Sequence, residues 1–133
     1  EWKERGVQEG KEYAILTDEM TRAWSGLSVR EYKELKGLKK ENLRDNMTDI
    51  ELVLNMLAEV TTTTLSKKEQ PETFAENRSV AKRGGKFAGD TRKRFEEEIG
   101  GKVISPLNAS DKPALETKKD NDENKDLSRE KKK

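Results

Sequence analysis

The sequence predicts an all-α domain: a small bundle of about four to five helices, a short extended segment and a disordered, charged C-terminal tail. Two patterns predict helices: apolar residues recur at helical spacing, and capping residues or glycines separate these runs. The composition limits the size of the core. Hydrophobic residues are 30% and charged residues 41% of the 133 residues, whereas typical domains have roughly 45–50% and 25%. We therefore expect a modest helical core beside disordered sequence.

The composition also excludes several classes of function. The chain has no Cys and no His, so disulfides, thiol nucleophiles, imidazole bases and the usual zinc sites are excluded. Its net charge of +1 gives no overall attraction to nucleic acid or membranes. No apolar run approaches the roughly 18 residues of a membrane span, and no signal peptide is recognisable. We expect a cytoplasmic protein with no cofactor, and a piece of a longer one, because it begins at Glu1.

Three segments follow from the distribution of charge. Residues 1–9 form a charged N-terminal lead-in, residues 10–105 the helical domain and residues 106–133 the disordered charged tail. From Asp111 onward the chain has eight basic and seven acidic residues, and its only apolar side chains are Ala114, Leu115 and Leu127. Such a segment buries too little surface to offset the entropy lost on ordering.

The first predicted helix starts at a cap provided by Thr17 or Asp18 and ends at Gly26. It contains Met20, Ala23 and Trp24. We interpret Trp24, like Trp2, as a packing residue, because an aromatic fraction of 5% is low for a protein that stacks bases.

A capping box, Ser28 to Glu31, opens the second predicted helix, which Gly37 stops. Its apolar residues are Val29, Tyr32 and Leu35. Together with the preceding helix it resembles a helix-turn-helix with Arg30, Lys33 and Lys36 exposed for DNA, although any compact helical domain produces the same pattern.

A second capping box, Thr48 to Glu51, opens the longest apolar helix, predicted over Asp49–Thr64. Ile50, Val53, Leu54, Leu57 and Val60 follow the helical spacing of apolar residues, so this helix is expected to be the centre of the core. The β-branched run Thr61–Thr64 is a poor helix former, and we expect regularity to be lost near Leu65 or Ser66. Asp45, Asp49 and Glu51 are interpreted as capping and surface-pairing residues.

Pro71 is suited to the first turn of the next helix, which contains Phe74, Ala75 and Val80. On a helix from Val80 to Ile99, one broad face carries the apolar and small residues. Gly84-Gly85 costs helix stability, so the sequence predicts either a bend there or close packing of another helix. Gly100-Gly101 is a helix stop, and KVISP, residues 102–106, is the extended segment.

This predicted helix provides the candidate site residues. The candidate helix-packing or dimer face consists of Ala81, Gly84, Phe87, Ala88 and Phe95, with Gly89 beside it. The candidate partner- or nucleic-acid-binding residues, on the opposite side, are Lys82, Arg83, Lys86, Lys93 and Arg94. Three interpretations of these cations remain open: a solvated helix face, an acidic protein partner, or DNA phosphates.

No motif in the sequence indicates catalysis. The glycine spacing and the Lys-Ser/Thr pair of a phosphate-binding loop are missing around Gly84-Gly85-Lys86. Asp120 to Asp126 lacks the glycine and terminal Glu of a calcium loop. No carboxylate pair or Ser/Thr nucleophile stands out, so we expect a protein that is not an enzyme.

Several motifs resemble the C-terminal region of BRO-type phage antirepressors and the corresponding part of DNA-damage-inducible protein D relatives. They are LKGLKKENLRDNMT, ELVLNMLAEVTTT, ENRSVAKRGGKFAG and GGKVISP, preceded by EYAILTDEMTRAWSGLSVREYK, over roughly residues 10–108. The resemblance implies a phage, prophage or SOS-type regulatory protein. The family's DNA-contacting N-terminal domain is absent from this chain, so no residue here inherits that role.

These observations give an expected function. We expect a non-enzymatic interaction domain that binds a protein partner, a repressor or a recombination or damage-response protein, or that forms a homodimer through helical surfaces. The alternative is an accessory DNA-binding module that uses the basic face of Val80–Ile99.

Overall fold

In the described residues of the computed structural model (2, 5–8 and 10–108), the chain is all-α, as predicted. Within that part of the chain, four α-helices and the 3₁₀ turn η2 follow each other: α1 (Lys11–Ser25), α2 (Val29–Leu35), η2 (Arg44–Asn46), α3 (Asp49–Glu69) and α4 (Phe74–Ile99). No strand occurs in this part of the chain. Of the tail predicted to be disordered, residues 106–133, the part from 109 to 133 lies outside the described residues.

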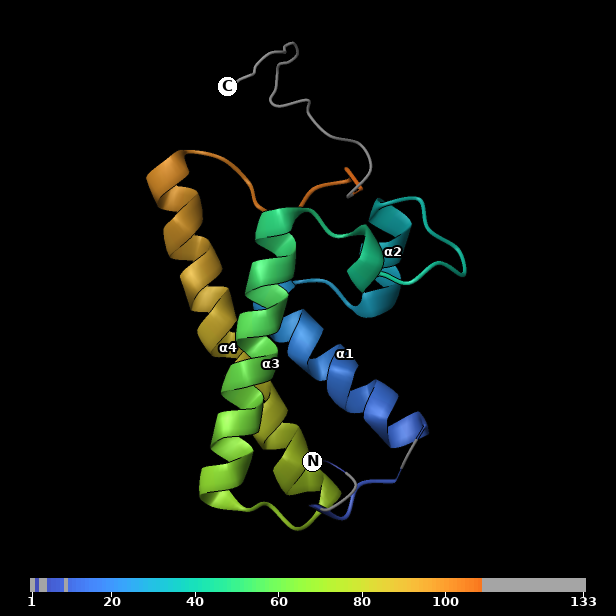
Figure 1. Cartoon of the computed structure of the whole chain (residues 1–133), viewed down its shortest axis with the longest axis vertical. Helices are drawn as coiled ribbons and strands as arrows, with labels where there is room; N and C mark the ends of the chain where they lie inside the picture. The colour runs from blue at the N-terminus through green and yellow to red at the C-terminus, as the bar shows by residue number, and fades with distance from the viewer. Residues whose placement is uncertain (1, 3–4, 9, 109–133) are drawn as a thin grey trace.

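The helices form one bundle built around α4. Figure 1 shows α3 and α4 crossing as an antiparallel pair, with α1 slanting across them and α2 beside the N-terminal end of α3. The contacts of α4 are divided between α1 and α3. The core therefore lies where these three helices meet, and α2 closes one end of it.

The first helix begins earlier than the sequence predicted. It starts at Lys11, because Gly10 turns the chain with φ 78° and the Glu12 side chain accepts a hydrogen bond from the backbone N–H of Gln8 (2.9 Å). Asp18, predicted as a cap of this helix, instead caps the next one: its Oδ1 accepts from the backbone N–H of Val29 at 2.8 Å. The predicted stop is confirmed, since Gly26 is left-handed with φ 83°.

The capping box of α2 forms as predicted. The hydroxyl of Ser28 accepts from the backbone N–H of Glu31 (3.1 Å), and the Glu31 carboxylate accepts from the backbone N–H of Ser28 (2.9 Å). The helix ends before Gly37, which has φ 71°. Local sequence signals are sufficient here because all the partners lie within three residues of each other.

The predicted loss of regularity near Leu65 is wrong: α3 continues through its threonines to Glu69. Tertiary packing and local bonding outweigh the low helix propensity of threonine. Thr62 is buried against α4, and the Thr64 hydroxyl donates to the backbone carbonyl of Val60 at 2.8 Å. The helix ends at Gln70, which has φ 51°.

The position predicted for Pro71 is also wrong. Pro71 lies before α4 rather than in its first turn, because Thr73 is the N-cap and accepts from the backbone N–H of Glu76 at 3.1 Å. Thr73 provides a side-chain oxygen acceptor that Pro71 lacks. The stop at Gly100 is confirmed, with φ 71°.

Trp24 and Tyr32 form the centre of the core. Both side chains are fully buried, and their ring centroids are 6.0 Å apart. The indole N–H of Trp24 donates to Oδ1 of Asn55 on α3 at 3.2 Å, which satisfies the polar atom of a buried ring. The core also includes Val7 and Val103. Residues assigned by sequence to the lead-in and the extended segment thus contribute to it.

Candidate interaction surfaces

Three glycines allow α4, which is continuous through them, to approach its neighbours closely. A Cβ atom at Gly84 would lie 2.8 Å from the backbone nitrogen of Thr62 on α3. One at Gly85 would lie 2.5 Å from the carbonyl oxygen of Met20 on α1, and one at Gly89 would lie 2.6 Å from that of Ala23. Of the two predicted possibilities, the continuous helix shows close packing.

The predicted helix-packing or dimer face is divided between the interior and the surface. Ala81, Gly84 and Ala88 are buried between α4 and its neighbours, so they are already covered within one chain. Phe87 does not share this face as predicted: its exposed fraction is 55%. A helical wheel grouped Phe87 with the small residues. The part of α4 that α1 and α3 cover is narrower than that group and leaves Phe87 outside.

An open apolar hollow lies on the exposed side of α4. Phe87, Thr91 and Phe95 line it, with Asp90, Arg94 and Glu98 around them, and its volume is about 460 Å³. Phe95 is partly buried and packs against the core, whereas Phe87 points away from it. The aromatic side chain of Phe87 is thus accessible to a partner at this hollow.

A second exposed apolar surface lies on α3, and we call it the α3 apolar face. It consists of Val53, Met56 and Val60, whose exposed fractions are 58%, 43% and 61%. Their spacing places all three on one side of the helix. Core packing does not cover this side, although the sequence pattern had assigned Val53 and Val60 to the core.

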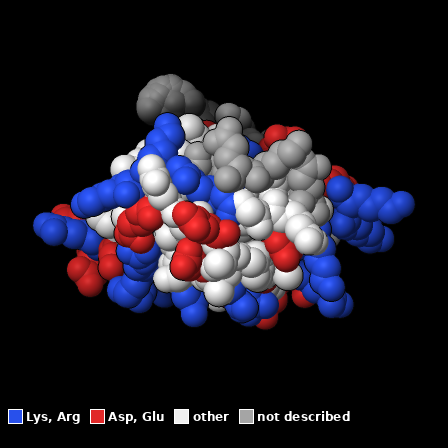
Figure 2. Space-filling model, turned by 90° about the horizontal axis from the view of Figure 1, so that it is seen from below, with Lys and Arg blue, Asp and Glu red and all other residues white. Residues whose placement is uncertain are grey.

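The five candidate cations are spread along the outer side of α4, and two of them have carboxylate partners. Arg83 donates to Glu69 of α3 (2.8 Å from Nη1), and Lys86 pairs with Asp90 (3.3 Å). Among the described residues, Lys82, Lys93 and Arg94 have no ion pair. Figure 2 shows acidic side chains interspersed with basic ones, with neither sign covering that view alone.

Arg92 and Glu96 form a different kind of pair. Arg92 donates from Nε to the carbonyl oxygen of Trp24 (2.7 Å) and from Nη1 to Glu96 (3.0 Å), and Glu96 also accepts from the backbone N–H of Val103 (3.0 Å). Burial alone would raise the pKa of the Glu96 carboxyl, but these two bonds together with the charges of Arg92 and Lys102 outweigh it and hold the pKa below its ordinary value. The pair links α4 to α1 and to the chain after Gly101.

The most buried charges are Lys36 and Glu51, which the sequence reasoning placed at the surface. Their side chains are fully buried, and Nζ of Lys36 lies 2.7 Å from Oε1 of Glu51. Lys36 also donates to the carbonyl oxygens of Ser105 (2.8 Å) and Leu107, while Glu51 accepts from the backbone N–H groups of Thr48 (2.8 Å) and Ser105 (3.0 Å). Glu51 therefore does serve in the capping box, but as part of a buried network.

This network fixes the segment 103–108, including residues 106–108, which the sequence had assigned to the tail. Lys36 and Glu51 bond backbone groups of Ser105 and Leu107, and Val103 at the start of the segment is buried. Burial raises the pKa of the neighbouring Tyr32 hydroxyl, and the charge of Glu51 adds to the increase. The three donors of Lys36 Nζ are used on Glu51 and on two backbone carbonyls, and Glu51 accepts from two backbone N–H groups as well, which indicates a structural role.

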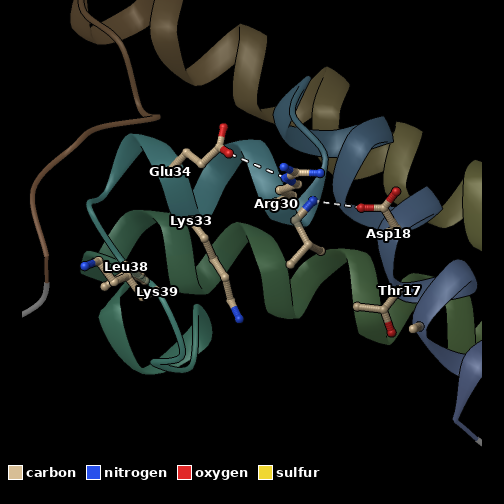
Figure 3. Close-up of a pocket in the computed structure, with 9 residues that line it drawn as sticks. Thr17, Asp18, Arg30, Lys33, Glu34, Leu38 and Lys39 are labelled. Atoms are coloured by element: carbon tan, nitrogen blue, oxygen red, sulfur yellow. Dashed lines mark hydrogen bonds and ion pairs between the residues drawn. The ribbon is translucent and has the colours of Figure 1, made fainter.

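A further hollow, of about 680 Å³, lies between α1 and α2 and is drawn in Figure 3. Three of its charged residues already have partners within the fold: Asp18 caps α2 and pairs with Arg22 (2.9 Å), and Arg30 pairs with Glu34 (3.5 Å). Lys33 and Lys39 also line it, and neither forms an ion pair in the part of the chain that the structure describes (Figure 3). It contains no nucleophile with an adjacent base, and the interpretation of α2 as a DNA-reading helix loses Lys36, which is buried.

Among the described residues, no group of three or more acidic side chains is arranged to hold a metal ion. No helix in this part of the chain is long and apolar enough to cross a membrane. No family model, no curated protein and no solved structure matches the chain.

Proposed function

We propose that the chain is a non-enzymatic interaction domain that binds a protein through the α3 apolar face. The observation that supports it is an exposed apolar strip in a chain of which 41% of residues are charged. Burial of exposed Val and Met side chains is the dominant favourable contribution to most protein association. The hollow at Phe87 adds a second apolar contact on α4.

The regulatory setting of the proposal comes from the resemblance. The motifs similar to BRO-type antirepressors and DNA-damage-inducible protein D relatives support a role in phage or damage-response regulation, with a repressor or a recombination or damage-response protein, or a second copy, as partner. The DNA-binding alternative has less support, because Arg83 and Lys86 already have carboxylate partners.

A pull-down from phage-induced or damage-induced lysate tests this function. The bait is the full chain, compared with Val53→Lys/Val60→Lys, which alters exposed side chains only. A matched control, Lys82→Glu/Lys93→Glu, changes two exposed residues elsewhere. We expect the same proteins, or tagged copies of this chain, to be retained by the wild type and the control and lost from the Val variant. Equal capture by all three would contradict the proposal.

A further inference from the structure

The exposed side of α3 has an ordered distribution of charge. Asp49, Val53, Met56, Val60, Thr64 and Lys67 are all exposed, and their spacing of three or four residues places them on one side of the helix. The strip therefore has an acidic N-terminal end, an apolar centre and a basic C-terminal end, to which Lys68 adds a second cation.

The charges at both ends of this strip are available to a partner. Among the described residues, Asp49, Lys67 and Lys68 form no ion pair, whereas the adjacent Glu69 is held by Arg83. Within α3 between them, the charged side chains are Glu51, which is buried with Lys36, and Glu59, which pairs with Arg44. The apolar centre thus has no unpaired charge of its own in this part of the chain.

We propose that a second copy of this chain docks on the α3 apolar face with its own α3 antiparallel. A two-fold axis between Met56 and Leu57 places Val53 opposite Val60 of the second copy. The same register places Asp49 opposite Thr64 and within about one turn of Lys67 and Lys68 of the second copy. Apolar residues then meet apolar residues, and opposite charges meet at both ends.

The charges at the two ends of the strip favour the antiparallel orientation and a second copy of this chain as the partner. A parallel pair would place Asp49 beside Asp49 and Lys67 beside Lys67, so like charges would repel, whereas antiparallel helices also have opposed macrodipoles. The acidic end of each strip meets the basic end of the other copy's strip. The surface is therefore self-complementary, as a two-fold interface requires. This inference rests on the proposed function, since it names the partner of the same surface.

The size of the strip limits the affinity. α3 has 21 residues, which corresponds to a length of about 31 Å. A contact through one helix per chain lies at the low end of interface sizes, so we expect association in the micromolar range. Measurements of molecular mass therefore need full-length chain at roughly 10 to 500 μM.

Cysteine cross-linking tests the orientation directly, because the chain has no Cys of its own. Met56→Cys lies next to the proposed axis and is expected to form a disulfide-linked dimer under mild oxidation. Thr64→Cys is expected to stay uncross-linked, because the proposed register separates the two Thr64 residues by about 22 Å along the axis. Lys82→Cys on the outer side of α4 is the control for random collision. Cross-linking of Met56→Cys no faster than this control would overturn the proposal, and efficient cross-linking of Thr64→Cys would overturn the antiparallel register.

Charge reversal provides the second test. By sedimentation equilibrium, Asp49→Lys and Lys67→Glu/Lys68→Glu are each expected to weaken the dimer about 5- to 10-fold, and their combination to restore it to within about 3-fold of wild type. Failure of the combined variant to recover would contradict the pairing. If the wild type stays monomeric over the whole range but another protein binds in a Val53- and Val60-dependent manner, this inference fails and the proposed function stands. A dimer insensitive to Val53→Lys/Val60→Lys overturns this inference, and the proposed function fails with it if no other protein binds in a Val53- and Val60-dependent manner.

Discussion

Gly85 and Gly89 determine, at the residue scale, how closely α4 approaches α1. Gly85→Ala is expected to destabilise the fold by about 1–3 kcal/mol, because its Cβ would overlap Met20 and Ala23, and overpacking costs more than the roughly 1 kcal/mol gained in helix propensity. Urea unfolding followed by circular dichroism measures the difference. Gly101→Ala is the control, since nothing lies within 4 Å of its Cβ position. Equal stability of both variants would contradict close packing as the reason for Gly85.

Glu96 makes stability depend on pH. Its pKa is lowered in the folded state, so its contribution is present above the ordinary carboxyl pKa of about 4.3 and is lost as pH falls through the folded-state value. We expect Glu96→Gln to lower the free energy of unfolding by about 1–2 kcal/mol at neutral pH and to have much less effect near pH 3. Denaturant unfolding at both pH values measures this.

Glu97→Gln is the matched control for this pH dependence, because Glu97 is exposed and has no ion pair among the described residues. It also removes an unfavourable charge near the C-terminal end of a helix, so a neutral or slightly stabilising effect is expected. A destabilisation of Glu96→Gln that stayed constant from pH 7 to about pH 3 would show that the residue acts by packing rather than by its charge.

At the scale of elements, Lys36 connects α2 to α3 and to the segment 103–108. Lys36→Met is expected to lower the free energy of unfolding by about 3–5 kcal/mol, because it leaves the buried Glu51 without a counter-charge. It also frees the carbonyl groups of Ser105 and Leu107, so faster hydrogen exchange is expected at the Ser105 amide. Lys33→Met is the control on the same helix. Similar losses in both variants would show that the network has no special role.

The elements that the sequence predicted well are those with local partners. The capping box at Ser28 and the helix ends at Gly26, Gly37 and Gly100 depend on residues a few positions apart. A sequence pattern is therefore sufficient to find them. Lys36, Glu51 and Ser105 are far apart in sequence, and a lone Lys or Glu is normally a surface residue. The length of α3 and the start of α1 were missed because burial of Thr62 and the hydrogen bond from the Gln8 N–H to Glu12 compensate for weak local preference.

The candidate surfaces were predicted less well than the helices, for a geometric reason. A helical wheel gives the relative directions of side chains, but it does not say how much of an apolar sector the neighbours cover. The broad face of α4 contains both the buried Ala88 and the exposed Phe87. On α3 the core uses Leu54 and Ala58 and leaves Val53 and Val60 outside. Surplus apolar surface of this kind becomes identifiable only once the packing partners are placed.

At the scale of the whole molecule, the balance of charge argues against nucleic acid as the partner. The net charge is +1, and carboxylates are interspersed with the cations of α4. We expect duplex DNA to bind more weakly than about 100 μM at physiological salt, and with a shallow salt dependence, because few phosphates would be neutralised. Fluorescence anisotropy with a labelled duplex at about 50 and 200 mM salt measures both quantities.

The variant that completes this experiment is Lys82→Glu/Lys93→Glu/Arg94→Glu, which reverses the three cations of α4 that have no ion pair in the described part of the chain. If solvent or a protein is their partner, the variant changes duplex affinity little, and the dimer proposed through α3 keeps its affinity. A duplex affinity that falls steeply with salt and disappears in this variant would instead establish the basic side of α4 as a phosphate-contacting surface. Because the two surfaces consist of different exposed residues, each can be altered without substituting a residue of the other.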